Sequence, residues 1–288
     1  MRKNKSFTLI ELLVVIVIIG ILAGVIMIST SSSITKASIT KSKVFEESVQ
    51  NNLAANMMSR WTFDTGLTSQ GDATNDDIKD VWGNNNGDVV SHAPTMLTES
   101  SCVTKKCLYF DGTFTDYVQV SAIPLLSTGS PFVLSSWVYP EATGSYRTIM
   151  GYDSRHRLLI SASGTMLSEQ SGEFGFYSQA EAVPDEKWTH VIYWSNGSEE
   201  RWYINGSLSG TPHSFDSIEW NQAFKIGQYD VANYPYKGRI DDVKVYNNAF
   251  SAQTIKKEYL SGLDLLLKNG TIFKDEYNER INVLAYDN

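Results

Sequence analysis

The chain has 288 residues, of which 42% are hydrophobic, 19% charged and 12% aromatic, and its net charge is −8. This composition excludes a disordered chain, a collagen and a polytopic membrane protein, and the acidic balance argues against nucleic-acid binding. The averages conceal two different parts. Residues 1–60 carry a net charge of +4, whereas residues 61–288 carry −12 and contain all seven prolines and 32 of the 34 aromatic residues. The composition therefore changes near Arg60–Trp61.

The first predicted element is an apolar helix. Residues 1–6 are short and basic, and residues 12–28 contain no polar side chain. As a helix, residues 7–28 extend about 33 Å, which is enough to cross a bilayer core of about 30 Å with the basic end in the cytoplasm. The apolar run is too long for a cleaved secretory signal. A simple signal anchor fits the length but does not explain Glu11, because a charged group in the membrane costs about 2.5–3.5 kcal/mol.

The start of this helix, Ser6-Phe7-Thr8-Leu9-Ile10-Glu11, resembles a type IV prepilin or pseudopilin. The resemblance implies that residues 1–6 are a leader, which a prepilin peptidase removes by cleaving between Ser6 and Phe7. Phe7 then becomes the N-methylated first residue. Glu11 neutralises the N-terminal amine of a neighbouring subunit, which offsets the cost of placing both charges in lipid. The family usually has glycine before the cleavage site, where this chain has Ser6.

The same resemblance implies partners and a location. The partners are other pilin subunits, the pilus or secretion assembly machinery and the cytoplasmic membrane. The chain crosses that membrane once and exports its C-terminal part, and it enters a surface pilus or a periplasmic pseudopilus after assembly. Apolar residues continue at helical spacing to about residue 58 and predict one long helix within residues 7–60. This stripe packs against neighbouring pilin helices, against the chain's own globular part, or against both.

From Trp61 onward, short runs alternate apolar and polar residues between glycine, asparagine, proline and serine, which predicts a mainly β region of about a dozen strands. Asn196-Gly197 and Asn205-Gly206 are hairpin signals. The order of the runs resembles a laminin-G-like, concanavalin A-like jelly roll over residues 61–249. The matching pieces are residues 61–64, 80–87, 108–112, 116–118, 132–138, 187–191, 202–206, 224–227 and 237–246. Residues 250–288 have helical spacing and predict a C-terminal helical segment.

Cys102 and Cys107 are the two cysteines of the chain, and they lie on the side of the membrane that we expect to be exported. A disulfide that closes a short loop before a strand is the favoured interpretation. Zinc binding would require two further ligands, and none of the four histidines stands at ligand spacing to the pair. Redox catalysis is a weaker alternative.

Acidic residues before a turn and on a late strand raise the alternative of a metal ion. In jelly rolls of the resembled type, a structural Ca²⁺ often joins an early Asp/Asn loop to a later Ile-Asp-Asp strand. Carried over by matching, this implies Asp80 and Asn85 from the loop and Asp242 from the strand as ligands, with carbonyl oxygens completing the six to eight that calcium needs. The alternative is that these acids are solvated turn residues.

Enzyme signatures are absent from the sequence, including the closely spaced carboxylate pair of retaining glycosidases. We therefore expect a non-enzymatic protein that binds a glycan or a protein, although a surface-anchored hydrolase is a minor alternative. Exposed aromatic residues in loops could stack on sugars, whereas three tryptophans in alternating strands are expected in the core (Trp137, Trp188 and Trp202). The loop candidates are Trp82, Tyr146, Tyr152, Trp220, Tyr229, Tyr234 and Tyr236.

Together these features predict a pilin-like subunit, in the role of a minor pilin, that presents a laminin-G-like domain for surface adhesion. The alternative is a pseudopilin of a secretion or DNA-uptake machine with a purely structural jelly roll. The net charge of −12 in residues 61–288 argues against DNA binding by this part.

Overall fold

The computed structural model describes residues 9–10, 12–20, 53–90, 92–123, 129–153, 156–170, 173–214, 220, 222–229 and 233–286. The chain forms two compact units, Met1–Asn52 and Leu53–Asn288. In the first unit, residues 9–10 and 12–20 are helical with exposed side chains. Among the described residues, no helix combines the length and the apolar character that crossing a membrane requires. The predicted cleavage, methylation and assembly residues Ser6, Phe7 and Glu11 lie outside the described residues.

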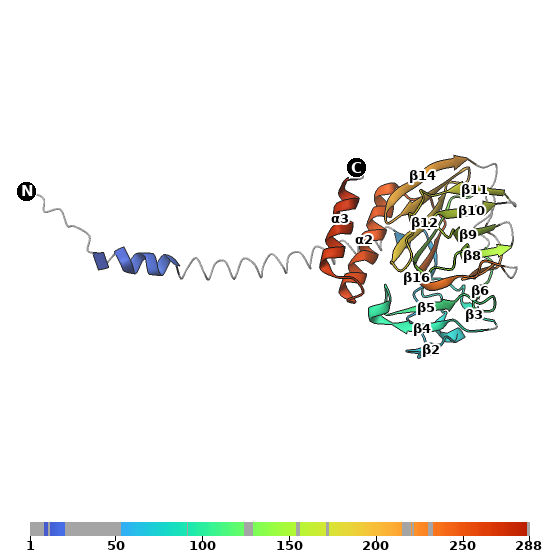
Figure 1. Ribbon diagram of the computed structural model, residues 1–288, viewed down its shortest axis with the longest axis horizontal. Helices are drawn as coiled ribbons and strands as arrows, with labels where there is room; N and C mark the ends of the chain where they lie inside the picture. Colours follow the sequence, from blue (N-terminus) through green and yellow to red (C-terminus); the bar gives the residue numbers. More distant parts are fainter. Residues whose placement is uncertain are drawn as a thin grey trace, which may run out of the picture. The chain divides into compact units, whose positions relative to one another are not determined.

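The second unit is a sandwich of two antiparallel sheets (Figure 1). In the described part of the chain, the larger sheet has nine strands: β1 (Met57–Trp61), β2 (Gly71–Asp72), β4 (Thr95–Thr98), β5 (Lys106–Asp111), β7 (Phe132–Pro140), β12 (Thr189–Ser195), β13 (Glu199–Ile204), β14 (Ser207–Ser214) and β16 (Lys237–Tyr246). Their order is β14-β13-β12-β7-β16-β5-β4-β2, with β1 also paired to β16.

The smaller sheet has seven strands among the described residues: β3 (Gly87–Val89), β6 (Val118–Val120), β8 (Arg147–Asp153), β9 (His156–Ile160), β10 (Met166–Gln170), β11 (Glu173–Tyr177) and β15 (Phe224–Ile226). Their order is β11-β10-β9-β8-β15-β6-β3. Short 3-10 turns span Asn75–Asp77 and Glu99–Ser101. The apolar members of the alternating pattern fill the space between the sheets, as with Val118 and Val120 in β6, whereas the intervening Gln119 is half-buried. The predicted mainly β sandwich is confirmed.

Two hairpins form where the Asn-Gly pairs predicted them. Asn205 and Gly206, with φ of 50° and 82°, connect β13 directly to β14. Both residues of such a tight turn need a positive φ, which asparagine and glycine tolerate best. Residues 196–198 join β12 to β13 as a three-residue connection, in which Gly197 has a positive φ of 95°.

Helices α2 (Ala252–Lys268) and α3 (Lys274–Tyr286) cover the outer face of the larger sheet (Figure 1). Ser251 is the N-cap of α2, and its hydroxyl accepts a hydrogen bond from the backbone N–H of Thr254. The helices and the sheet share a second apolar cluster that contains Trp137, Trp188 and Tyr259. Gly262 allows the close approach, because a Cβ there would lie 2.5 Å from Nε1 of Trp137.

The three strand tryptophans expected in the core are buried, and Trp202 lies between the two sheets.

The prediction of one long helix within residues 7–60 was wrong at its end, since residues 57–60 belong to β1. Strand β5 pairs with Lys237–Ile240 of β16, and β1 pairs with the later residues Val243–Tyr246. The second half of β16 would otherwise lack hydrogen-bond partners on this side, so tertiary pairing overrides the helical spacing of the sequence.

Candidate functional site

A groove of about 1000 Å³ lies between the β13–β14 hairpin and the helices α2 and α3. Its wall on the sheet side is the edge strand β14 with the hairpin turn, and the two helices form the other wall. Amide and hydroxyl side chains contribute much of the lining: Gln179, Asn205, Ser207, Ser209 and Gln253. These groups donate and accept hydrogen bonds, so the groove suits a ligand that is rich in hydroxyl groups.

Cationic side chains outnumber acidic ones in the lining of the groove, although the unit around it is acidic. Four cationic side chains and one acidic side chain contribute to its lining: Lys187, Arg201, Lys256, Arg280 and Glu279. By comparison, residues 61–288 together carry 29 acidic and 17 basic side chains. A concave site of one sign raises the local concentration of ligands of the opposite sign. Since Glu199 and Glu276 neutralise Arg201 and Arg280, the excess of positive charge in the groove comes from Lys187 and Lys256, and it favours polar ligands with negative charge.

Two of these cations are held in place by neighbouring groups. Nη1 of Arg280 donates to the Trp188 carbonyl at 2.8 Å, and Nη2 lies 2.6 Å from the Glu276 carboxylate. Arg201 pairs with Glu199, and its guanidinium stacks 4.6 Å from the ring centroid of Trp194. These contacts occupy the donor nitrogens of Arg280 and fix both side chains as parts of the groove wall.

The loop aromatic residues proposed as sugar-stacking groups mostly pack within the protein. Tyr229, Tyr236 and Trp220 are buried, and Tyr146, Tyr152 and Tyr234 are half-buried. The Arg157 guanidinium lies 4.4 Å from the ring centroid of Tyr229 and 5.6 Å from that of Tyr234. Trp82, at 51% exposure, is the one member of the predicted set that stays exposed.

The predicted calcium residues of the loop bind protein groups instead. One oxygen of Asp80 accepts the backbone N–H groups of Arg60, Trp82 and Gly83, and the other accepts that of Asn85. These four bonds close the loop, and three of them converge on Oδ1. The Asn85 side chain donates to the Ser59 hydroxyl at 2.7 Å.

Asp242, the third predicted calcium residue, lies in two ion pairs. Its Oδ1 is 2.8 Å from Nε of Arg60, and its Oδ2 is 2.7 Å from Nζ of Lys244. Burial alone would raise the pKa of Asp242, but the charges of Arg60 and Lys244 hold it well below its usual range. In this structure groups of the protein bind Asp80 and Asp242, and calcium binding by Asp80, Asn85 and Asp242 stays a prediction.

The predicted disulfide is present between Cys102 and Cys107. Both cysteines are buried, and the loop that they close is held by the neighbouring Asp241, whose Oδ2 accepts the N–H groups of Val103 and Thr104. Burial and the charge of Asp242 raise the pKa of Asp241 well above its usual range. The two adjacent acids of β16 therefore differ in role. Asp241 accepts hydrogen bonds from the disulfide loop, whereas Asp242 pairs with cations.

A buried Ser–His–Glu group beneath α2 was not anticipated from the sequence. The Ser135 hydroxyl lies 2.9 Å from Nε2 of His190 and 2.9 Å from Oε1 of Glu258. Each of the three residues is at most 2% exposed, and burial lowers the pKa of His190 to about 4. The group ties α2 to the sheet. No spacing rule links a serine in β7, a histidine in β12 and a glutamate in α2, so only the fold reveals it.

Comparisons with known proteins bear on both units of the chain. A family model described as "Concanavalin A-like lectin/glucanases superfamily" matches residues 111–256, and one described as "Prokaryotic N-terminal methylation motif" matches residues 1–27. No curated protein sequence matches the chain. The first match covers half of the chain, and the second covers the segment that resembles a type IV prepilin.

Several solved structures share the sandwich. The fourth domain of an extracellular arabinanase from Geobacillus stearothermophilus, in complex with arabinotriose, is 21% identical with a TM-score of 0.53, and the match covers 73% of this chain and 98% of that domain. The botulinum neurotoxin serotype D ligand binding domain, in complex with N-acetylneuraminic acid, is 13% identical with a TM-score of 0.56 and coverage of 75% and 53%.

A Trypanosoma rangeli sialidase, in complex with 2,3-difluorosialic acid, is 12% identical with a TM-score of 0.52. That match covers 78% of this chain and 39% of the sialidase. The chain thus spans about half of the toxin domain and less of the sialidase. At these identities the likeness establishes the fold, and it does not by itself assign an activity.

Proposed function

Because the chain belongs to the concanavalin A-like lectin/glucanases superfamily and begins with a type IV pilin N-terminus, we propose that it is a minor pilin-like subunit that binds carbohydrate for surface adhesion. The N-terminal motif supports a membrane-anchored protein with an exported C-terminal part and pilus assembly partners. The jelly roll supplies the ligand-binding surface, and its groove beside α2 and α3 is the binding site.

The observation that carries this proposal is the polar, cationic groove in an otherwise acidic unit. Hydroxyl and amide groups of the lining match the hydroxyl groups of a sugar, and the cations match a carboxylate or sulfate group. The structural neighbours were solved with arabinotriose and with N-acetylneuraminic acid, which supports sugars as the ligand class. The charge of the groove favours acidic glycans over neutral ones.

A glycan array tests this proposal on the unit Leu53–Asn288. Both apolar clusters and the disulfide lie within this unit, so we expect it to fold without residues 1–52. We expect retention of acidic glycans, and Lys256→Glu should weaken it by about tenfold or more because it reverses a charge in the groove.

Lys257→Glu is the matched control. Lys257 is the next residue of α2, is also half-buried, and is not among the residues that line the groove. Both variants change the net charge equally, so only a ligand in the groove distinguishes them. Equal weakening by both variants, or the absence of any retained glycan at high protein concentration, would contradict binding in the groove.

We infer binding rather than catalysis. The Ser–His–Glu group is buried beneath α2, where a substrate cannot reach the Ser135 hydroxyl, which supports this inference. Incubation of the retained glycans with the unit Leu53–Asn288, followed by mass spectrometry, tests it. Cleavage products would identify a surface-anchored hydrolase instead.

Filament assembly is tested separately on the full chain. Glu11→Ala should leave export intact and block incorporation into the filament, because the neighbouring amine loses its counter-charge in lipid. Glu47→Ala removes an acid outside the apolar run and serves as the control. Normal incorporation of the Glu11 variant would contradict the assembly role. Loss of incorporation without any glycan binding would favour a pseudopilin whose jelly roll is structural.

A further inference from the structure

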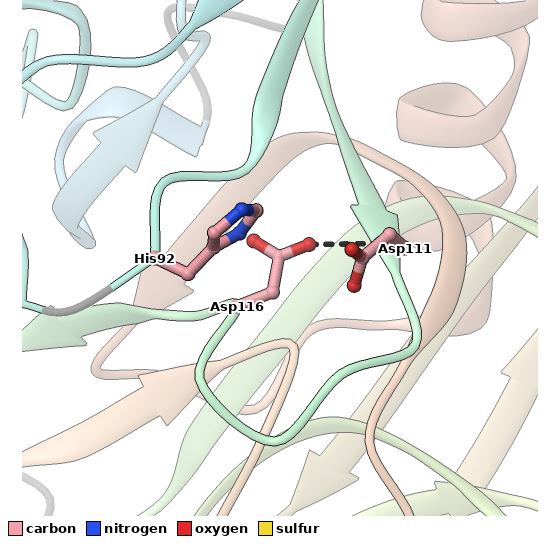
Figure 2. A group of neighbouring side chains, drawn as sticks. All are labelled: His92, Asp111 and Asp116. Carbon is pink, nitrogen blue, oxygen red and sulfur yellow. Dashed lines mark hydrogen bonds between the residues drawn. The ribbon is translucent and has the colours of Figure 1, made fainter.

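Three potential metal ligands meet where the end of β5 in the larger sheet lies beside the loops next to β3 and β6 of the smaller sheet. In the part of the chain that the structure describes, one ligand atom from each of His92, Asp111 and Asp116 lies within 4.8 Å of the other two. His92 comes from the connection between β3 and β4, whereas Asp111 ends β5 and Asp116 precedes β6 (Figure 2).

Backbone hydrogen bonds bring the two loops together. The N–H of His92 donates to the Thr115 carbonyl at 3.1 Å, and His92 and Asp116 form an isolated parallel bridge. Within the second loop, the N–H of Asp111 donates to Oδ2 of Asp116 at 2.8 Å, and the N–H of Thr113 donates to Oδ1 of Asp111 at 2.7 Å. These bonds hold the His92 backbone and the two carboxylates in place without an ion.

The cluster contains a buried carboxylate, that of Asp116, whose hydrogen bonding is incomplete. The residue is only 2% exposed, and its Oδ1 has no hydrogen-bond partner among the residues that the structure describes. This oxygen points toward the His92 ring (Figure 2). A buried carboxylate oxygen without a partner is costly, since it loses its hydration and gains nothing in exchange. A cation between the three side chains would supply the missing interaction.

We propose that His92, Asp111 and Asp116 bind one divalent metal ion of the zinc class. The imidazole nitrogen selects a transition metal over Ca²⁺, which prefers six to eight oxygen ligands. Three protein ligands, of which His92 and Asp111 are exposed, leave a coordination position open to water or to an exogenous ligand. The two carboxylates balance the charge of the ion, and the ion cross-links the two loops.

Zinc titration of the full chain in detergent tests this site. After removal of metals with a chelator, calorimetry with Zn²⁺ should give one site per chain. Replacement with Co²⁺ should give the visible absorption of a four-coordinate centre. His92→Ala removes an exposed ligand without disturbing the core, and it should weaken zinc binding by at least about 100-fold. Asp111→Asn should weaken it as well, because the amide is a poorer ligand.

His213→Ala is the matched control. His213 is half-buried and lies beside the Glu200 carboxylate, with Nδ1 at 3.2 Å from Oε1 of Glu200. Binding to any pair of histidine and acid would respond to this variant as well, whereas the proposed site would not. The proposal is overturned if the chain does not bind Zn²⁺, if His92→Ala leaves the affinity unchanged, or if His213→Ala weakens binding as much as His92→Ala does.

Discussion

Asp242 and Asp116 are buried to the same extent in one β-sandwich, yet their surroundings differ. Each is 2% exposed. Both oxygens of Asp242 lie in ion pairs with Arg60 and Lys244, whereas Oδ1 of Asp116 has no hydrogen-bond partner in the described part of the chain. The cost of burying a charge is thus offset by the protein's own cations in the first case, and we infer an external cation in the second. Burial of an acid alone does not indicate a metal site. A carboxylate oxygen that is buried and lacks a hydrogen-bond or ion-pair partner is the stronger indication.

Removing Arg60, one of the two cations that pair with Asp242, should have the largest effect on stability. Arg60→Ala leaves the buried Asp242 with Lys244 as its one remaining cation, so we expect the free energy of unfolding to fall by about 3–5 kcal/mol. Urea denaturation of the unit Leu53–Asn288, followed by tryptophan fluorescence, measures this change. Lys79→Ala breaks the exposed pair with Asp76 and should cost less than about 1 kcal/mol. Similar losses in the two variants would show that burial does not strengthen the Asp242 pair.

The same pair predicts a dependence on pH. The folded pKa of Asp242 lies below its unfolded value, so the ion pair stabilises the fold at pH values above about 4. As the pH falls below the unfolded pKa, the unfolded chain takes up the proton first and this stabilisation is lost. The difference in unfolding free energy between the wild type and Arg60→Ala should therefore shrink below pH 4. A constant difference from pH 7 to pH 3 would contradict this assignment.

The loop acid Asp80 should have the next largest effect. Its carboxylate accepts four backbone N–H groups, and Asp80→Ala leaves them to water or without partners. We expect a loss of about 2 kcal/mol in the free energy of unfolding. Asp88→Ala, which removes an exposed acid in β3, should change the same quantity by less than about 0.5 kcal/mol. Equal effects would mean that the loop bonds contribute little.

The sequence predicted the fold well because its signals there are local. Alternation placed Val118 and Val120 in the core, and the Asn205-Gly206 pair placed the hairpin turn. Cys102 and Cys107 were paired because they are the two cysteines of an exported domain. Each of these features depends on neighbouring residues and on backbone preferences that a sequence displays directly.

The sites were predicted less well because they depend on distant partners. Arg60 and Asp242 are separated by 182 positions, and no pattern in the sequence shows that the arginine reaches the acid. The cluster of His92 with Asp116 depends on the pairing of two loops. The groove depends on helices that fold back beside β14. The prediction for the end of the long helix was wrong for the same reason, because residues 57–60 pair with the distant strand β16.

Asp111 of the proposed metal site should contribute little to stability without metal and much with it, unlike Arg60 and Asp80. Asp111→Asn keeps an acceptor for the Thr113 N–H and removes one charge beside Asp116, so we expect the metal-free unfolding free energy to change by less than about 0.5 kcal/mol. The same variant should lose most of the stabilisation that Zn²⁺ gives to the wild type. Urea denaturation with a chelator and with excess Zn²⁺ measures both quantities. A large loss in the metal-free variant would show that Asp111 is mainly structural.

Calcium should have the smallest effect. The oxygens of Asp80 and Asp242 already bind protein donors, and a Ca²⁺ ion would have to displace at least two cations and several N–H groups to reach them. We therefore expect the midpoint of thermal unfolding to be the same, within about 1 °C, with millimolar Ca²⁺ and with a chelator. A ligand that binds the folded state at 100 times its dissociation constant would instead add about 2.7 kcal/mol, which is several degrees for a unit of this size. A rise of that size with Ca²⁺ would mean that the Asp242 ion pairs yield to the metal, and Asp242→Asn would then have to abolish it.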